Sequence, residues 1–128
     1  MEMDYNKIYN KILTDEELME TKQHGSSDYP FQYYYDNLEL FDFHCIEWHW
    51  HREFEFLYVE SGEVTCGIGE KQIILSEGEA IFINSKILHR FYASSSGIIP
   101  NFVCMPEFIA PENSLIYKKY ILPIISSN

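Results

Sequence analysis

Residues 49–62 decide the fold and read H-W-H-R-E-F-E-F-L-Y-V-E-S-G. Side chains two apart on an extended strand point the same way, so His49 and His51 can approach one point. Glu55 shares its strand phase with Leu57, which predicts that its carboxylate faces a closed interior. A buried carboxylate is costly unless a metal, a protonated histidine or a polar ligand group pairs with it. The stretch therefore predicts a polar site in the protein interior.

A second stretch, residues 78–89, complements the first and reads G-E-A-I-F-I-N-S-K-I-L-H. It ends on a histidine at the start of an expected strand. Three imidazoles and one carboxylate are suitable ligands for Zn, Ni, Fe or Mn. The expected ligand-binding or metal-binding set is His49, His51, Glu55 and His89. The same side chains can instead form a hydrogen-bonded cluster without metal, or contact an organic ligand, and we assign no catalytic residue.

Length and composition limit the function classes. The chain has 128 residues, enough for one domain with a core. Hydrophobic residues make up 46% and aromatic residues 16%, which excludes a disordered chain. The formal net charge of -11 makes this chain alone a poor partner for nucleic acid, because an acidic surface repels phosphates.

Cysteine usage and hydropathy indicate the compartment. Cys45, Cys66 and Cys104 lie in apolar segments without a paired spacing, which predicts reduced thiols in a cytoplasmic protein. No signal peptide is recognisable at the start, and no apolar run approaches the ~20 residues of a membrane span. We therefore expect a cytoplasmic protein that does not contact a membrane.

Residues 29–110 carry the signal of an all-β domain. Short runs rich in aromatic and branched residues alternate with glycine, asparagine and serine. The expected strands are 32–35, 39–50, 54–61, 63–68, 71–75, 79–84, 89–94 and 98–104. Tight turns are expected at 60–63, 67–70 and 76–79. This spacing predicts an antiparallel sandwich or barrel.

The two ends of the chain read as helical. Residues 1–28 predict a helical arm, in which Thr14 is the N-cap of a helix and Gly25 lies at the C-terminal end of that helix. His24 is then a helix-terminal residue rather than a ligand. Residues 111–128 predict the start of a C-terminal helical region.

Strand alternation must send some aromatic side chains into the barrel. The candidates for pocket walls are Tyr33, Tyr34, Tyr35 and Phe91, of which we assign Tyr33, Tyr35 and Phe91 to the pocket. The even-numbered aromatic residues from Trp48 to Tyr58 share the opposite face. They are expected to pack against a second sheet, a helix or a partner subunit.

The two stretches resemble the paired motifs of the cupin superfamily. The matching positions are His49, His51, Glu55 and Gly62 in the first motif, and Gly78 and His89 in the second. The chain departs from the enzyme-type pattern at Asn84, Lys86 and Ala93, where proline, glycine and asparagine are usual. The resemblance implies a double-stranded β-helix, or jelly-roll barrel, with flanking N- and C-terminal helices.

Within the cupins, residues 24–125 most resemble the N-terminal sensor domain of AraC-type transcriptional regulators. The runs H-G-x-x-x-Y-P-F at 24–31 and Y-K-K-Y-I-L-P-I-I at 117–125 add to the two motifs. This resemblance implies a small-molecule effector in the barrel and a homodimer. It also implies DNA binding through a C-terminal helix-turn-helix domain that is absent here. The chain then corresponds to the sensor half of a longer protein.

Two other functions stay open, because a fold alone does not choose a function. One is a stand-alone metal-dependent cupin enzyme of the dioxygenase or isomerase type, and the other is an oligomerisation module. The departures at Asn84, Lys86 and Ala93 favour the sensor, so we expect no enzymatic activity.

Overall fold

The computed structural model describes residues 12–127. The strands in this part of the chain are β1 (Phe31–Asn37), β2 (Cys45–His49), β3 (Phe54–Tyr58), β4 (Ser61–Gly62), β5 (Val64–Ile68), β6 (Lys71–Leu75), β7 (Ala80–Ile83), β8 (His89–Tyr92) and β9 (Gly97–Cys104). The helical elements are η1 (Leu38–Leu40), η2 (Asp42–His44), α2 (Pro106–Ile109), η3 (Tyr117–Ile121) and α3 (Leu122–Ile125). Strands therefore dominate, as the sequence predicts.

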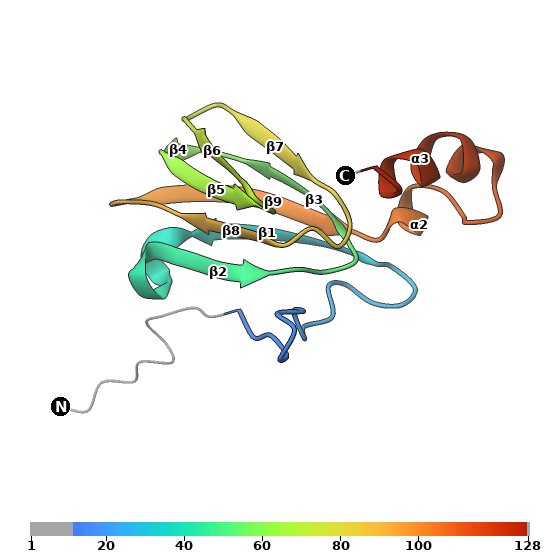
Figure 1. The fold of residues 1–128 in the computed structure, drawn as a ribbon, viewed down its shortest axis with the longest axis horizontal. Helices are drawn as coiled ribbons and strands as arrows, with labels where there is room; N and C mark the ends of the chain where they lie inside the picture. The colour runs from blue at the N-terminus through green and yellow to red at the C-terminus, as the bar shows by residue number, and fades with distance from the viewer. Residues whose placement is uncertain (1–11, 128) are drawn as a thin grey trace.

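The strands form two antiparallel sheets (Figure 1). One has the order β1-β9-β3-β7, with β4 also on β9, and the other has the order β2-β8-β5-β6. Strands distant in sequence pair with each other, such as β1 with β9 and β2 with β8. This is the expected all-β jelly-roll arrangement.

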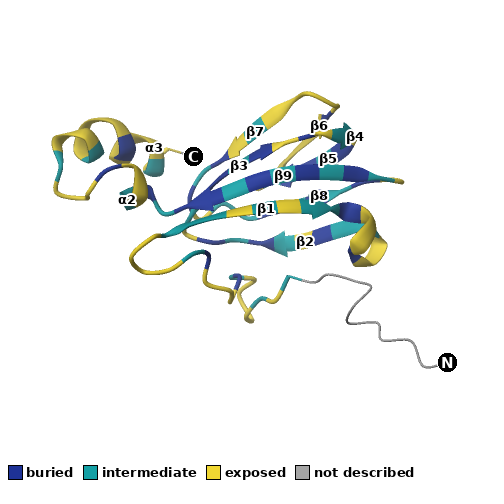
Figure 2. Ribbon diagram, turned by 180° about the vertical axis from the view of Figure 1, so that it is seen from behind, coloured by how far each residue is buried: buried dark blue, intermediate teal, exposed yellow. Residues whose placement is uncertain are grey.

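The core lies between the sheets. Alternate residues of β9 are buried and half-buried, as Figure 2 shows along its length. The largest core cluster includes Leu57, Val59, Ile83 and Ile99, each at most 2% exposed. Full burial of such a side chain contributes about 1.5–3 kcal/mol. The inward-facing apolar side chains thus stabilise the barrel, and the other inward-facing positions carry polar side chains.

The motif glycines stand where the backbone needs a left-handed conformation. Gly62 has φ +85° and Gly78 has φ +89°. A Cβ atom on Gly62 would lie 2.2 Å from the backbone oxygen of Ser96. Glycine adopts this conformation without a steric penalty. Gly78 lies in the expected turn before β7, but the expected hairpin turn at 60–63 is wrong, because Gly62 lies in β4 and pairs with Gly97 of β9.

One expected strand, 39–50, is wrong in its first half. Leu38–Leu40 and Asp42–His44 form two short 3-10 turns, and β2 begins only at Cys45. The side chain of Asn37 accepts a hydrogen bond from the backbone N–H of Glu39, which starts the first turn. The expected strand 54–61 is also interrupted, because β3 ends at Tyr58.

The expected helix from Thr14 to Gly25 is wrong. Thr14 pairs with Glu20 in an isolated antiparallel bridge, and Met19 pairs with Trp50 beside β2. The Asp15 carboxylate accepts from two backbone N–H groups and stabilises a turn rather than a helix. Residues 12–28 run beside β2 in Figure 1. The helical expectation for 1–11 lies outside the described residues.

The C-terminal segment is helical, as expected. The Ser114 hydroxyl accepts from the backbone N–H of Tyr117 at 3.1 Å, so Ser114 caps the first turn. At the other end, the Asn84 amide donates to the carbonyls of Ile124 at 2.7 Å and Ser127 at 3.1 Å. Asn84, one of the departures from the enzyme-type motif, therefore holds the helical segment at one end of the barrel (Figure 1). Among residues 12–127, no helix is long and apolar enough to cross a membrane.

Candidate functional site

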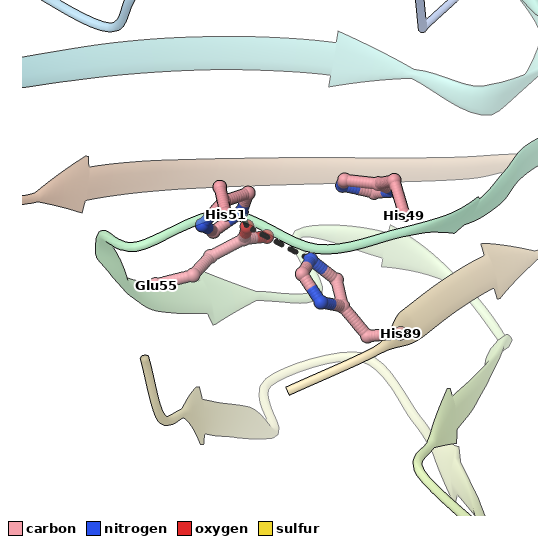
Figure 3. A group of neighbouring side chains, drawn as sticks. All are labelled: His49, His51, Glu55 and His89. Carbon is pink, nitrogen blue, oxygen red and sulfur yellow. Dashed lines mark hydrogen bonds and ion pairs between the residues drawn. The ribbon is translucent and has the colours of Figure 1, made fainter. Parts of the chain in front are cut away.

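The four motif side chains meet inside the barrel (Figure 3). His49 ends β2 and pairs across the sheet with His89, the first residue of β8. His51 lies in the link between β2 and β3, and Glu55 lies on β3. All four are buried, and one ligand atom from each lies within 4.8 Å of the others. The structure thus brings together the set expected from the sequence.

Each of the three imidazoles is oriented by a backbone carbonyl two residues away. The Nδ1 atoms bond to these carbonyls at 2.8 Å for His49 with Glu47, 3.1 Å for His51 with Glu53, and 2.7 Å for His89 with Ile87. A carbonyl can only accept, so each Nδ1 carries the proton. The lone pair of each neutral ring is therefore on Nε2, the arrangement typical of metal-ligating histidines.

The Nε2 atoms face a carboxylate. His51 Nε2 lies 3.1 Å and His89 Nε2 lies 3.4 Å from Oε1 of Glu55. His89 Nε2 has no hydrogen-bond partner among the described residues. Lone pairs of neutral imidazoles directed at an anion repel it, so a proton or a metal ion between them is needed. The cluster is therefore built to hold a positive charge at its centre.

The ionisation states agree with this geometry. Burial acts to raise the pKa of Glu55, but the contacts with His51 and His89 hold that pKa well below its usual range. Burial and the neighbouring His89 lower the pKa of His49 to about 4. For His51, burial acts to lower the pKa, but the hydrogen bond to Glu55 raises it. Glu55 is thus ionised and His49 neutral, the forms that ligate metals.

The donor set fits a divalent transition metal. Three imidazole nitrogens and one carboxylate oxygen converge, and their outer nitrogens already have partners. Zn, Ni, Fe and Mn all accept such ligands. The buried, unpartnered Nε2 of His89 is the observation that a bound metal would account for. The cluster can therefore hold a metal.

A cavity of about 340 Å³ opens onto the cluster. Its apolar wall consists of Ile12, Leu13, Phe41, Ile46, Phe91 and Val103. Its polar wall, besides the cluster, consists of Glu20, Thr21, Lys22, His24, Tyr34, Asp36 and Asn101. Apolar cavities with a few placed polar groups are typical small-molecule sites.

The expected pocket aromatics are partly wrong. Phe91 lines the cavity, but Tyr33 is 54% and Tyr35 is 56% exposed. Alternation along β1 instead turns Tyr34 and Asp36 inward. The Tyr35 hydroxyl bonds to the Glu60 carboxylate on the outer surface. The expectation that Tyr33 and Tyr35 face the cavity is therefore wrong, and the even-numbered Tyr34 and Asp36 of β1 face it instead.

His24 is a cavity residue, not a helix-terminal one. Its Nε2 donates to Glu20 at 2.7 Å, and its Nδ1 lies 2.5 Å from the Tyr34 hydroxyl. Its ring meets the His51 ring edge-on, with 5.6 Å between centroids. The N-terminal segment therefore reaches the immediate surroundings of the cluster.

Sequence reasoning missed several polar residues of the cavity wall, namely Glu20, His24, Asp36 and Asn101. Two of them left a signal. Asn101 is a polar residue within the apolar run I-I-P-N-F-V-C, and it is only 5% exposed. Asp36 ends an aromatic run in the same way. An isolated polar residue in a buried strand indicates a partner or a ligand.

The comparisons with known proteins agree with this geometry. Residues 45–99 match the family model described as "Cupin domain". The chain is 28% identical over 119 residues to the uncharacterized HTH-type transcriptional regulator YdeC of Bacillus subtilis. That match covers 91% of this chain, which spans 40% of the length of the regulator.

Solved structures share the fold. An RmlC-like cupin from Shewanella frigidimarina has a TM-score of 0.52 at 20% identity, covering 58% of this chain and 65% of that one. Protein NMB1881 from Neisseria meningitidis has a TM-score of 0.51 at 17% identity, covering 58% of this chain and 73% of that one. Residues 45–99 are thus similar in sequence to the cupin domain, and the two-sheet barrel shares its fold with a solved cupin structure.

Proposed function

We propose that this chain is the effector-sensing and dimerisation domain of an AraC-type transcriptional regulator, and that it binds a small molecule in the barrel. One observation carries this proposal: the N-terminal segment forms part of the cavity wall. Glu20, Lys22 and His24 line the cavity together with barrel residues. A ligand there contacts the barrel and the segment together, so its binding biases the position of the segment.

Four hydrogen bonds link residues 12–28 to the barrel, three of them at Trp50 and one between His24 and Tyr34. The Trp50 indole donates to the Glu17 carbonyl at 3.0 Å, and its backbone N–H donates to the Leu18 carbonyl at 3.0 Å. Glu20 donates its backbone N–H to the Trp50 carbonyl at 2.9 Å. Each such bond contributes only about 1 kcal/mol net. A ligand can therefore strengthen or weaken this attachment with ordinary binding energy.

We assign DNA binding, and with it the control of transcription, to a part of a longer protein outside this chain. The relative YdeC is named as an HTH-type transcriptional regulator, and this chain covers 40% of its length. With a net charge of -11, this chain alone is expected not to bind duplex DNA. DNA binding would come from a helix-turn-helix domain outside it. Such a regulator acts in the cytoplasm, and the described cysteines are free thiols, as expected there.

The outer face of the β1-β9-β3-β7 sheet supports a homodimer. It carries a groove of about 430 Å³ lined by Tyr33, Phe56, Leu57, Tyr58, Ala80, Ile81, Phe82, Pro100, Asn101 and Phe102. None of these residues is charged. Two copies of a chain with net charge -11 can therefore meet there without placing like charges opposite each other.

The test follows Trp50 during a small-molecule screen. A Trp48→Phe variant leaves Trp50 as the only tryptophan. A ligand of the cavity should change both the melting temperature and the Trp50 emission, because the segment contacts that indole. A matched Phe91→Trp variant, analysed by thermal shift alone, should lose the ligand because its wall is filled. Ligands that stabilise the protein equally in both variants and leave Trp50 emission unchanged would contradict the proposal.

A metal-dependent cupin enzyme, of the dioxygenase or isomerase type, is the second candidate. The observation that favours it is that three of the four cluster residues, His49, His51 and Glu55, line the cavity. A metal held there would supply Lewis-acid polarisation of a bound substrate. Turnover of any cavity ligand by the metal-loaded chain would favour the enzyme, and its recovery unchanged favours the sensor.

A further inference from the structure

A second polar group lies on the cavity wall, apart from the His/Glu cluster. Asp36 on β1 and Asn101 on β9 both line the cavity. The Asn101 amide donates to Asp36 Oδ2 at 2.9 Å and to the Ile99 carbonyl at 2.8 Å. These two bonds use both N–H groups of the amide, so Asn101 is fixed in place. It holds the Asp36 carboxylate at a defined position on the wall.

The Asp36 carboxylate is short of hydrogen-bond donors. Among residues 12–127, only Asn101 donates to it, and no ion pair includes it. An ionised carboxylate offers about four acceptor sites. Burial also raises the pKa of Asp36, although the Asn101 bond and Lys22 act in the opposite direction. A cavity carboxylate that can accept further hydrogen bonds is suited to bind a ligand that donates a hydrogen bond.

The strand register gives the spacing between the two polar groups. On β9, Val103 pairs with Glu55, whereas Ile99 pairs with Asp36, four positions away. Asn101 lies midway between those levels. At about 3.4 Å per residue, Asn101 lies ~7 Å and Asp36 ~14 Å along the sheet from the level of Glu55. Apolar side chains, including Phe91 and Val103, line the same cavity.

We propose that the cavity takes a short, mainly aliphatic molecule with a metal-binding oxygen at one end and a hydroxyl or ammonium donor at the other. The oxygen end meets the His/Glu cluster, and the donor end bonds to Asp36. This inference rests on the proposed function, since it names the ligand class for the same cavity. A chain of about six carbons reaches from one polar group to the other, since an extended chain advances roughly 1.1 Å per bond, as in a strand that rises ~3.4 Å over three bonds.

The test compares three probes of equal length: 6-aminohexanoate, 6-hydroxyhexanoate and hexanoate. Calorimetric titration of the Co²⁺-loaded chain should show the amino or the hydroxy probe binding at least about tenfold tighter than hexanoate, because a hydrogen bond to a charged group contributes this much. Asp36→Asn should abolish the advantage, so that the three probes bind with similar affinity. Asp28→Asn, at an exposed carboxylate, is the matched control and should behave as the wild type.

The outcomes separate this inference from the proposed function. Equal affinity for the three probes, or an advantage that survives in Asp36→Asn, would overturn the inference while the metal and sensing proposals stand. The same ratio is measured in the metal-free chain. If Co²⁺ fails to bind but the Asp36-dependent advantage persists, the donor end is supported and the metal end is overturned.

Discussion

Replacing Glu55 with Gln should have opposite effects on the metal-free and the metal-loaded protein. The substitution keeps the shape of the side chain and removes its charge. In the metal-free protein, Glu55 Oε1 faces Nε2 of His51 at 3.1 Å and of His89 at 3.4 Å. An amide N–H can donate to either lone pair, whereas the carboxylate needs a protonated ring. At pH 8, we expect Glu55→Gln to raise the free energy of unfolding of the metal-free protein by about 1–3 kcal/mol.

In the metal-loaded protein the same change removes the anionic ligand. Removing a residue that hydrogen-bonds to a metal ligand lowers metal affinity about 10–100-fold. Removing a ligand itself should therefore lower the affinity at least ~100-fold. That factor corresponds to about 2.7 kcal/mol of binding free energy. Stabilisation by saturating Zn²⁺ should fall by a similar amount, or roughly 8–13 °C in melting temperature for a chain of this size.

The assay has two parts. Elemental analysis of protein purified without a histidine tag gives metal occupancy, and thermal unfolding at pH 8 is followed with EDTA and then with Zn²⁺. Glu63→Gln is the control, because Glu63 is exposed and lies between β4 and β5. Wild-type metal occupancy in Glu55→Gln, together with a lower melting temperature in EDTA, would refute the reasoning about the lone pairs.

Three further predictions concern the backbone at Lys86, the uncharged groove and the pH dependence of stability. Lys86 has φ +64°, at a position where the motif usually has glycine. Lys86→Gly should therefore raise the free energy of unfolding, measured by urea titration, by about 1 kcal/mol. No gain in stability would mean that the left-handed backbone at Lys86 is not strained. The chain should sediment as a dimer, and Phe82→Lys, at a ring 40% exposed in the uncharged groove, should yield monomers, whereas Lys at the exposed Ile74 of the other sheet should not. The pKa of His49 is about 4 in the folded metal-free protein and about 6.5 in the unfolded chain. The folded protein therefore takes up a proton at His49 only at a lower pH than the unfolded chain does. Stability should therefore be full above pH 6.5 and fall by up to about 3 kcal/mol towards pH 4, less so in His49→Gln.

The sequence predicted the barrel and the four-residue cluster because both depend on local patterns. Alternating apolar residues and motif glycines specify strands and turns, and His49 and Glu55 lie on strands where parity holds. His51 reached the cluster for a different reason. It lies after the end of β2, and its ring is oriented by its bond to the Glu53 carbonyl.

The missed features depend on contacts between distant segments. Helical spacing from Thr14 onward gave no hint that Met19 would pair with Trp50. That pairing, and not local propensity, places His24 next to the cluster. For β1, three consecutive tyrosines give no phase, and only pairing with β9 turns Tyr34 inward.

We propose that His49, His51, Glu55 and His89 form one metal-centred ligand site in the barrel. The most direct test of this claim is a crystal structure of the zinc-loaded chain with data collected on both sides of the zinc absorption edge. We predict an anomalous peak inside the barrel, about 2.0–2.2 Å from the three Nε2 atoms and from a Glu55 oxygen. Zinc bound only at other positions, with the four side chains bonded to one another or to water, would contradict the claim.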